Sequence, residues 1–199
     1  MKATFLLLAS MYVTSAVASP DELPSVTAHP IFKQPYTCTE HWLGNLKAPG
    51  DALGTDCVIQ EMVEVKGRVW MRAYKGNGSR NTDWYGWGKE VLSPCSCEVV
   101  NVRDNPAANQ PGKLGKPPAG FVELKRDDGV HFVLAHVTRM AVKPGDKVES
   151  GQLIAYVGNN GFSRHPHIHM GAWRDKEPLQ IRFDLAAMGK LFEDDRAGL

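Results

Sequence analysis

The chain has 199 residues, of which 43% are hydrophobic and 23% are charged, and its formal net charge at pH 7 is +1. This length suffices for one domain with a hydrophobic core, or for one domain with a small appendage. The near-neutral charge argues against a nucleic-acid-binding protein, which normally presents a basic surface, and the composition excludes a chain that is disordered throughout.

The first 18 residues have the layout of a secretory signal peptide. Lys2 supplies a positive start, the apolar stretch 3–13 is too short to span a bilayer, and Ala16-Val17-Ala18 has the small-x-small pattern of a cleavage site. We therefore predict cleavage after Ala18 and an exported product, in the periplasm or outside the cell. A buried N-terminal helix is the alternative. No later apolar run is long enough to cross a membrane, so the mature chain is not expected to be an integral membrane protein.

Export changes the interpretation of the four cysteines, because an oxidising compartment favours disulfides. Three pairings are open. Cys38 with Cys57 would close a loop and pin the N-terminal region, which leaves Cys95 and Cys97, with only Ser96 between them. Otherwise, Cys95 and Cys97 each pair with one of the other two cysteines. A C-x-C metal or redox site is a further alternative.

After the leader, the composition divides the chain into three parts. Residues 19–57 are rich in Pro, Gly and polar residues, which predicts a loosely structured, disulfide-pinned lead-in wrapped on the core. Residues 58–185 contain short β-type runs and are expected to form the core. Residues 186–199 are expected to hold the end of a terminal helix and a frayed tail.

Short runs rich in Val, Ile and aromatic residues predict the strands, and Gly- and Asn-containing turn signals separate them. The predicted strands are residues 58–65, 68–74, 90–92, 98–102, 121–125, 130–137, 152–157 and 167–173. Many short strands at this spacing favour a mainly β fold with an antiparallel sheet or sandwich. Residues 105–120 contain repeated Pro and Gly and predict an exposed loop, whereas the apolar spacing within residues 181–192 predicts a short C-terminal helix.

The most informative motif is His165-Pro166-His167-Ile168-His169. Successive side chains of a strand point to opposite faces, so His167 and His169 share one face and can converge on a cation or a water molecule. His136 ends an apolar strand, where an imidazole can be oriented as a general base. His131 lies on the opposite face of that strand and is expected to be a surface or structural residue.

A longer pattern connects these histidines. Its segments are Ala135-His136, residues 142–148, 151–155, 157–159 and 161–163, and Pro166-His167-Ile168-His169. In order, spacing and turn glycines this pattern resembles the lysostaphin-type (LytM-like) zinc metalloendopeptidases. Residues 88–94 followed by 98–100 look like the first core hairpin of that family. The similarity covers roughly residues 83–173 and implies the antiparallel β-sheet or sandwich core of these peptidases.

The resemblance also implies roles for the histidines. The second histidine of the H-x-H motif, His169, would bind Zn²⁺, one ion per chain. His167 and His136 would flank the attacking water, one as base and the other as stabiliser of the oxyanion. Family members cleave short peptides of bacterial cell walls, so peptidoglycan or its peptides would be the partner.

One metal ligand of the family pattern is missing. The family supplies its other two ligands as a His followed four residues later by an Asp, shortly before the first hairpin. Asp83 matches the Asp, but Ser79 stands where the His is expected. Asn81 would share a face with Asp83 in an extended segment and is a weak candidate ligand. A distant residue such as His41 or His29 is the remaining alternative.

Aromatic residues cluster beside this segment, in Trp84-Tyr85-Gly86-Trp87. They can form a wall that binds a sugar or a peptide, or they can be core residues. Arg164 can contact a carboxylate of a wall peptide, or it can be a solvated surface residue.

Two functions follow from these features. The first is an active zinc-dependent peptidase that hydrolyses peptidoglycan cross-links or stem peptides. The second is a degenerate module that keeps the fold, binds wall peptides or regulates another wall hydrolase through a protein contact, and cleaves nothing. The segment around Pro144-Gly145-Asp146 also resembles half of a lipoyl or biotinyl carrier domain, but no second half is present.

Overall fold

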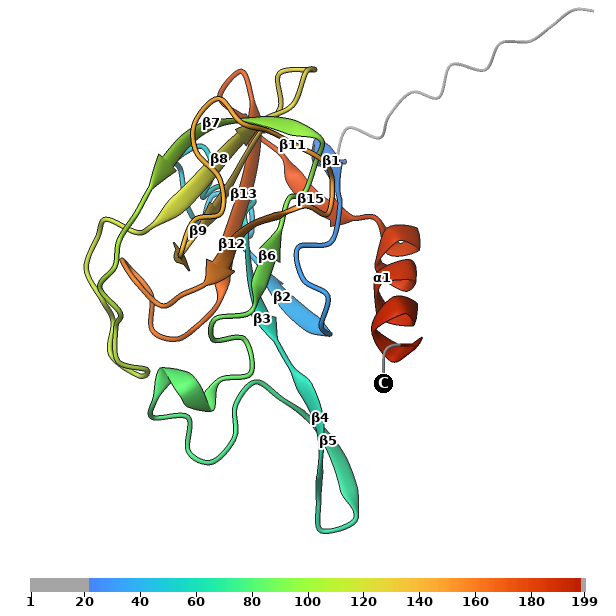
Figure 1. The fold of residues 1–199 in the computed structure, drawn as a ribbon. Helices are drawn as coiled ribbons and strands as arrows, with labels where there is room; N and C mark the ends of the chain where they lie inside the picture. The colour runs from blue at the N-terminus through green and yellow to red at the C-terminus, as the bar shows by residue number, and fades with distance from the viewer. Residues whose placement is uncertain (1–21, 198–199) are drawn as a thin grey trace, which may run out of the picture.

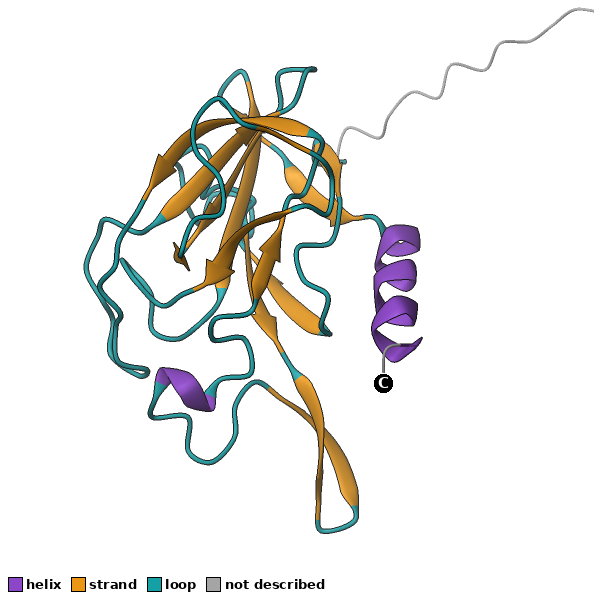
Figure 2. Ribbon diagram, in the orientation of Figure 1, coloured by secondary structure: helices purple, strands orange, loops and turns teal. Residues whose placement is uncertain are grey.

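The computed structural model describes residues 22–197, so the predicted leader lies outside the described residues. Strands dominate and one α-helix lies near the C-terminus (Figures 1 and 2), which confirms the predicted mainly β fold. The strands are β1 (Ser25–Ala28), β2 (Tyr36–Glu40), β3 (Thr55–Ile59), β4 (Glu61–Val65), β5 (Arg68–Arg72), β6 (Glu90–Leu92), β7 (Cys97–Arg103), β8 (Phe121–Lys125), β9 (His131–Ala135), β10 (Val137–Thr138), β11 (Lys147–Val148), β12 (Leu153–Val157), β13 (Ile168–Arg174), β14 (Glu177–Pro178) and β15 (Gln180–Phe183). The helices are the 3-10 helix η1 (Asn81–Asp83) and α1 (Leu185–Ala197).

The largest sheet has the strand order β11-β7-β8-β9-β13-β3-β2, and each neighbouring pair is antiparallel. Strands β8 and β9 alternate between fully buried and half-buried residues, as expected of strands with one face on a core. A smaller sheet, β10-β12-β6, packs against the same core. The largest fully buried side chains are those of Phe32, Phe132, Ile31, Ile59, Leu92 and Leu124.

The lead-in is more ordered than predicted. Strand β2 pairs antiparallel with β3, and β1 pairs parallel with β15, so residues from both ends of the chain join the sheets. The prediction of a loosely structured segment was wrong here because β1 and β2 are short and only partly buried, which leaves a weak apolar pattern. Their partners, and not their own composition, stabilise them as strands.

The C-terminal helix begins later than predicted. Residues 180–183 form strand β15, and the carboxylate of Asp184 then accepts hydrogen bonds from the backbone N–H groups of Ala186 and Ala187, at 2.9 and 3.0 Å. This is an N-cap, and it places the helix start at Leu185. The helix continues to Ala197. Within residues 22–197 no helix has the length and apolar character needed to cross a membrane.

Strands β4 and β5 form a separate two-stranded ribbon that projects from the body of the molecule (Figure 1). The turn between them contains Lys66 and Gly67, both at positive φ. Several large apolar side chains of the ribbon are exposed, including those of Met62 and Trp70, which are 74% and 53% exposed. The ribbon therefore contributes little to the core.

The four cysteines form two disulfides, Cys38–Cys57 and Cys95–Cys97, and no cysteine in the described part of the chain is free. This is one of the three predicted pairings. Cys38 and Cys57 are also direct partners in the β2–β3 register. The first disulfide therefore fixes the edge strand β2 of the main sheet against its neighbour β3.

Replacing Cys38 and Cys57 with serine is expected to lower the free energy of unfolding by about 3 kcal/mol, because the lost cross-link closes a long loop in the unfolded chain. Replacing Cys95 and Cys97 is the matched control. Their sequence separation is only 2, against 19 for the first pair, so the loss should be clearly smaller. Denaturant titration of both variants measures this, and equal losses would contradict the expectation.

Candidate active site

A cavity of about 750 Å³, the groove, lies where β9, β13 and β3 meet the loops around them. It brings together His136, which follows β9, and the two histidines His167 and His169 at the start of β13. His41, Asp51 and Asp56 also line the groove, although the sequence pattern did not predict them as a group of site residues. The predicted convergence of His136, His167 and His169 is thus present in the structure.

His136 is held in a strained and fixed position. Its φ is 65°, in the left-handed region that non-glycine residues rarely adopt. The Nδ1 atom lies 2.8 Å from the backbone oxygen of Asn160. Because a carbonyl oxygen only accepts, Nδ1–H is the donor, and Nε2 keeps a free lone pair. Such strain is typical of functional positions.

His167 has the same tautomer. Its Nδ1 lies 2.8 Å from the backbone oxygen of His165 and 3.3 Å from Oγ of Ser163, so Nδ1–H donates to the carbonyl. Nε2 of His167 makes no hydrogen bond within the described residues and lies 3.7 Å from Oδ1 of Asp56. The ring centroids of His136 and His167 are 4.6 Å apart, so two imidazoles whose Nε2 atoms have no hydrogen bond in the described chain lie side by side in the groove.

Burial keeps both imidazoles neutral. It lowers the pKa of His136 to about 3, with a further contribution from the neighbouring His167. Burial also lowers the pKa of His167. Near pH 7 both side chains can therefore accept a proton, which is the state a general base requires.

His169 belongs to a second group, with His41 and Asp56. One ligand atom from each of the three lies within 4.8 Å of the others. Nδ1 of His169 is 2.9 Å from Oδ1 of Asp56, and Nε2 of His41 is 3.4 Å from Oδ2 of the same carboxylate. The rings of His41 and His169 are stacked, with centroids 5.3 Å apart.

The sheet register explains why these three residues meet. His169 on β13 lies directly opposite Asp56 on β3, and Thr39 on β2 lies opposite Asp56 from the other side. His41 comes two residues after Thr39, and its backbone N–H donates to the oxygen of Gly54 at 2.8 Å. Opposite residues of neighbouring strands share a face, so the three side chains line one edge of the groove.

The other nitrogen of His169 faces the loop between β2 and β3. Nε2 lies 2.9 Å from the backbone oxygen of Gly50 and 3.3 Å from Oδ1 of Asp51. Burial alone would lower the pKa of His169, but the hydrogen bonds with Asp51 and Asp56 raise it to about 10. Burial alone would raise the pKa of Asp56, but the hydrogen bond with His169 and the nearby imidazoles lower it below its ordinary value.

The predicted ligands Asp83 and Asn81 lie elsewhere. Asp83 ends η1, where its carboxylate accepts hydrogen bonds from the backbone N–H and guanidinium of Arg80, at 3.0 Å for Arg80 Nη2. The hydrogen bonds from Arg80 hold the pKa of Asp83 below its usual range. Asn81 is bonded to Asn109 and Asn159. Neither lines the groove, because β3 occupies the sheet position beside His169.

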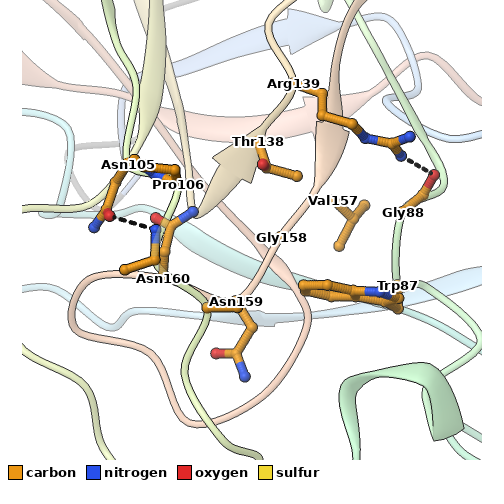
Figure 3. A pocket seen from close by; sticks show the side chains of 12 residues that line it. Trp87, Gly88, Asn105, Pro106, Thr138, Arg139, Val157, Gly158, Asn159 and Asn160 are labelled. Atoms are coloured by element: carbon orange, nitrogen blue, oxygen red, sulfur yellow. Dashed lines mark hydrogen bonds between the residues drawn. The ribbon is translucent and has the colours of Figure 1, made fainter.

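The four predicted substrate-binding residues lie in four different environments. Trp84 stacks on His165, with ring centroids 4.5 Å apart, so its ring packs against the loop that carries His167. Tyr85 packs against the core. Trp87 lines a second cavity, drawn in Figure 3, and only Arg164 lines the groove itself.

Sequence reasoning did not select Asp51 and Asp56, and it named His41 only as a distant alternative. A signal was present, because a Cys38–Cys57 disulfide between antiparallel strands places Thr39 opposite Asp56 and His41 close by. That pairing was one of three open alternatives, so the signal could not be used.

A sequence model of Peptidase family M23 matches residues 82–181. The glycyl-glycine endopeptidase ALE-1 of Staphylococcus capitis is 41% identical over 49 residues, which cover 24% of this chain and 14% of that protein. An uncharacterized metalloprotease of Haemophilus influenzae is 33% identical over 82 residues, which cover 41% of this chain and 15% of that protein. The aligned parts are thus less than a quarter of the length of these relatives.

Two solved structures are also similar to part of this chain. A variant of the catalytic domain of the prophage-encoded M23 protein EnpA from Enterococcus faecalis is 19% identical, covers 76% of this chain and 92% of that chain, and has a TM-score of 0.49. The catalytic domain of lysostaphin from Staphylococcus simulans is 19% identical, covers 78% and 92%, and has a TM-score of 0.42. The region matched by the family model includes the three predicted site histidines and Asp83, but it begins after His41 and Asp56.

Proposed function

Since the chain belongs to peptidase family M23, we propose that it is an exported metallopeptidase that hydrolyses peptide bonds of peptidoglycan, in cross-links or stem peptides. One observation carries the proposal. Two neutral imidazoles, His136 and His167, lie beside a group of three side chains able to hold a metal ion, within one groove. This combination provides a base and a metal site where a peptide can lie.

The donor set of this group fits zinc. Two imidazole nitrogens and one carboxylate oxygen are ligands that Zn²⁺ prefers, and metal binding would displace the Nδ1 proton that His169 shares with Asp56. Three protein ligands leave one position open, as in catalytic zinc sites. We assign the ligands as His41, Asp56 and His169, in place of the pattern with Asp83 and Asn81. When bound there, zinc would polarise the scissile carbonyl and lower the pKa of an attacking water.

We assign the proton transfers of the reaction to the two neutral imidazoles, those of His136 and His167. Nε2 of His136 or of His167 accepts the proton of the attacking water, and it returns that proton to the leaving amine. The Nδ1–H bonds to the backbone oxygens of Asn160 and His165 fix both rings for this transfer. Arg164 lines the same groove, where its guanidinium can pair with a carboxylate of the stem peptide.

Two further observations support export and the wall substrate. The chain forms two disulfides, and disulfides persist in oxidising compartments outside the cytoplasm. One similar protein, ALE-1, is named a glycyl-glycine endopeptidase. Short, flexible cross-links of this type would enter an open groove with little steric hindrance.

The test is hydrolysis of purified peptidoglycan by the chain from Ser19 onward. We expect new amino termini by mass spectrometry, loss of activity with a chelator and recovery with zinc. If chelator-sensitive cleavage is absent from both cross-linked and uncross-linked peptides, the peptidase proposal is wrong. Retained binding to wall fragments would then indicate the degenerate module.

Replacing Asp51 with asparagine is expected to weaken zinc binding by roughly 10-fold or more. Asp51 holds Nε2–H of His169, and a carboxylate in this position orients a ligand histidine and raises its basicity. Competition with a chromophoric chelator measures the affinity. Asp128→Asn is the control, because Asp128 pairs with Arg126 away from the groove. Equal zinc affinity in both variants would contradict this role.

A further inference from the structure

The second cavity, of about 450 Å³, has no lining residue in common with the groove, but single segments of the chain run from one to the other. The segment that follows β9 contributes to both, because His136 lines the groove whereas Thr138 and Arg139 line the second cavity (Figure 3). Sites for small ligands commonly have volumes of about 300–1,000 Å³. The second cavity is therefore large enough for a ligand of its own.

Asn159 and Asn160 form the wall nearest to the catalytic histidines. The backbone oxygen of Asn160 accepts from His136, and Oδ1 of Asn159 accepts from Ser163, which lies 3.3 Å from His167. Both side-chain amides are also hydrogen-bonded within the protein, Asn159 to Asn81 and Asn109, and Asn160 to Val137 and Gly120. These bonds fix the wall in place.

The groups that remain available are mostly donors. Within the described chain, the indole of Trp87 has no hydrogen-bond partner for its N–H and no stacked aromatic ring, and the hydroxyl of Thr138 has no partner. Arg139 uses only Nη2, which donates to the oxygen of Gly88 at 3.0 Å (Figure 3). The cavity thus offers a flat apolar ring and several free N–H groups.

Arg139 is also held in place before any ligand arrives. Its φ is 47°, in the left-handed region. Its guanidinium stacks on the ring of Tyr156, 4.1 Å from the ring centroid. A fixed guanidinium loses little conformational entropy on binding, which favours a ligand with acceptor oxygens.

We propose that the second cavity binds an N-acetylated sugar ring of the glycan strand to which the scissile peptide is attached. The proposal rests on the proposed function, in which peptidoglycan is the substrate. The face of an indole carries negative charge density, which complements the C–H face of a pyranose. Hydroxyl and acetamido oxygens would accept from Arg139 and from the Trp87 N–H. Because the cavity adjoins the groove, one substrate strand can occupy both.

A peptide-free trisaccharide of N-acetylglucosamine is the probe. We expect it to bind the intact chain and to shift the NMR signal of the Trp87 indole N–H, with or without a chelator. Trp87→Leu and Arg139→Gln should each weaken binding at least ~10-fold. Trp70→Leu, on the exposed ribbon, is the matched control and should bind like the unaltered chain.

The outcomes separate this proposal from the peptidase proposal. Absence of trisaccharide binding at millimolar concentration, or equal binding by Trp87→Leu, would overturn the sugar site even if peptides are cleaved. A shift of the Trp87 signal by a sugar-free stem peptide alone would also overturn it, in favour of a peptide subsite. Trisaccharide binding without any peptide hydrolysis would support the sugar site while the peptidase proposal fails.

Discussion

Replacing His136 with alanine is expected to lower kcat/KM for peptide hydrolysis by roughly 10²–10⁴-fold, the usual contribution of a positioned acid–base group. Its Nε2 is free, its Nδ1–H is bound to Asn160, and burial keeps the imidazole neutral. His136 is not among the three candidate ligands, so the zinc content should be unchanged. Steady-state kinetics together with metal analysis measure both quantities.

The matched control is His131→Ala, at the other end of β9 from His136. His131 pairs with Glu123 and stacks on Trp173, outside the groove, so its replacement should change kcat/KM by no more than a few fold. His167→Ala should resemble His136→Ala, and the double variant should lose little more than either single one, because the two rings act as a unit. Near-normal turnover by His136→Ala with zinc retained would refute the assigned mechanism.

Replacing Asp56 or His41 with alanine is expected to remove zinc, whereas Asp83→Ala should retain it. The candidate ligand atoms of Asp56, His41 and His169 lie within 4.8 Å of one another. The carboxylate of Asp83 is instead hydrogen-bonded to Arg80. Loss of a residue that only hydrogen-bonds to a metal ligand typically weakens metal binding by about 10–100-fold. Loss of a ligand itself should therefore weaken zinc binding by more than that. Metal content per chain, measured after dialysis, gives the result.

The comparison of Asp83→Ala with Asp56→Ala and His41→Ala decides between the two sets of zinc ligands. Circular dichroism should first show that each variant is folded, since Asp83→Ala removes the hydrogen bonds that close η1. His41→Ala provides a second measurement if Asp56→Ala is unstable. Loss of zinc from Asp83→Ala with retention in the other two variants would restore the ligand position implied by the family pattern.

Much of the core could be predicted from the sequence. Strands such as β8 and β9 lie in the main sheet and consist of short runs rich in Phe, Val and Leu, so their pattern appears in the chain itself. The strands near the two ends of the described chain were harder to predict. Strand β1 is stabilised by β15, and residues 181–183 were assigned to the helix because a short segment with apolar residues at positions 181 and 183 fits both structures.

For the site, the sequence by itself determined His136, His167 and His169, because a strand end and a two-residue repeat fix which face these side chains share. The family pattern also pointed to Asp83, whose carboxylate is hydrogen-bonded to Arg80 in the structure. Only the tertiary structure decided the partners of His169. Strand pairing joins β13 to β3 and β3 to β2, so His41 and Asp56 reach His169 from more than one hundred residues away. A register between distant strands depends on long-range packing, which leaves no local periodic signal in the chain.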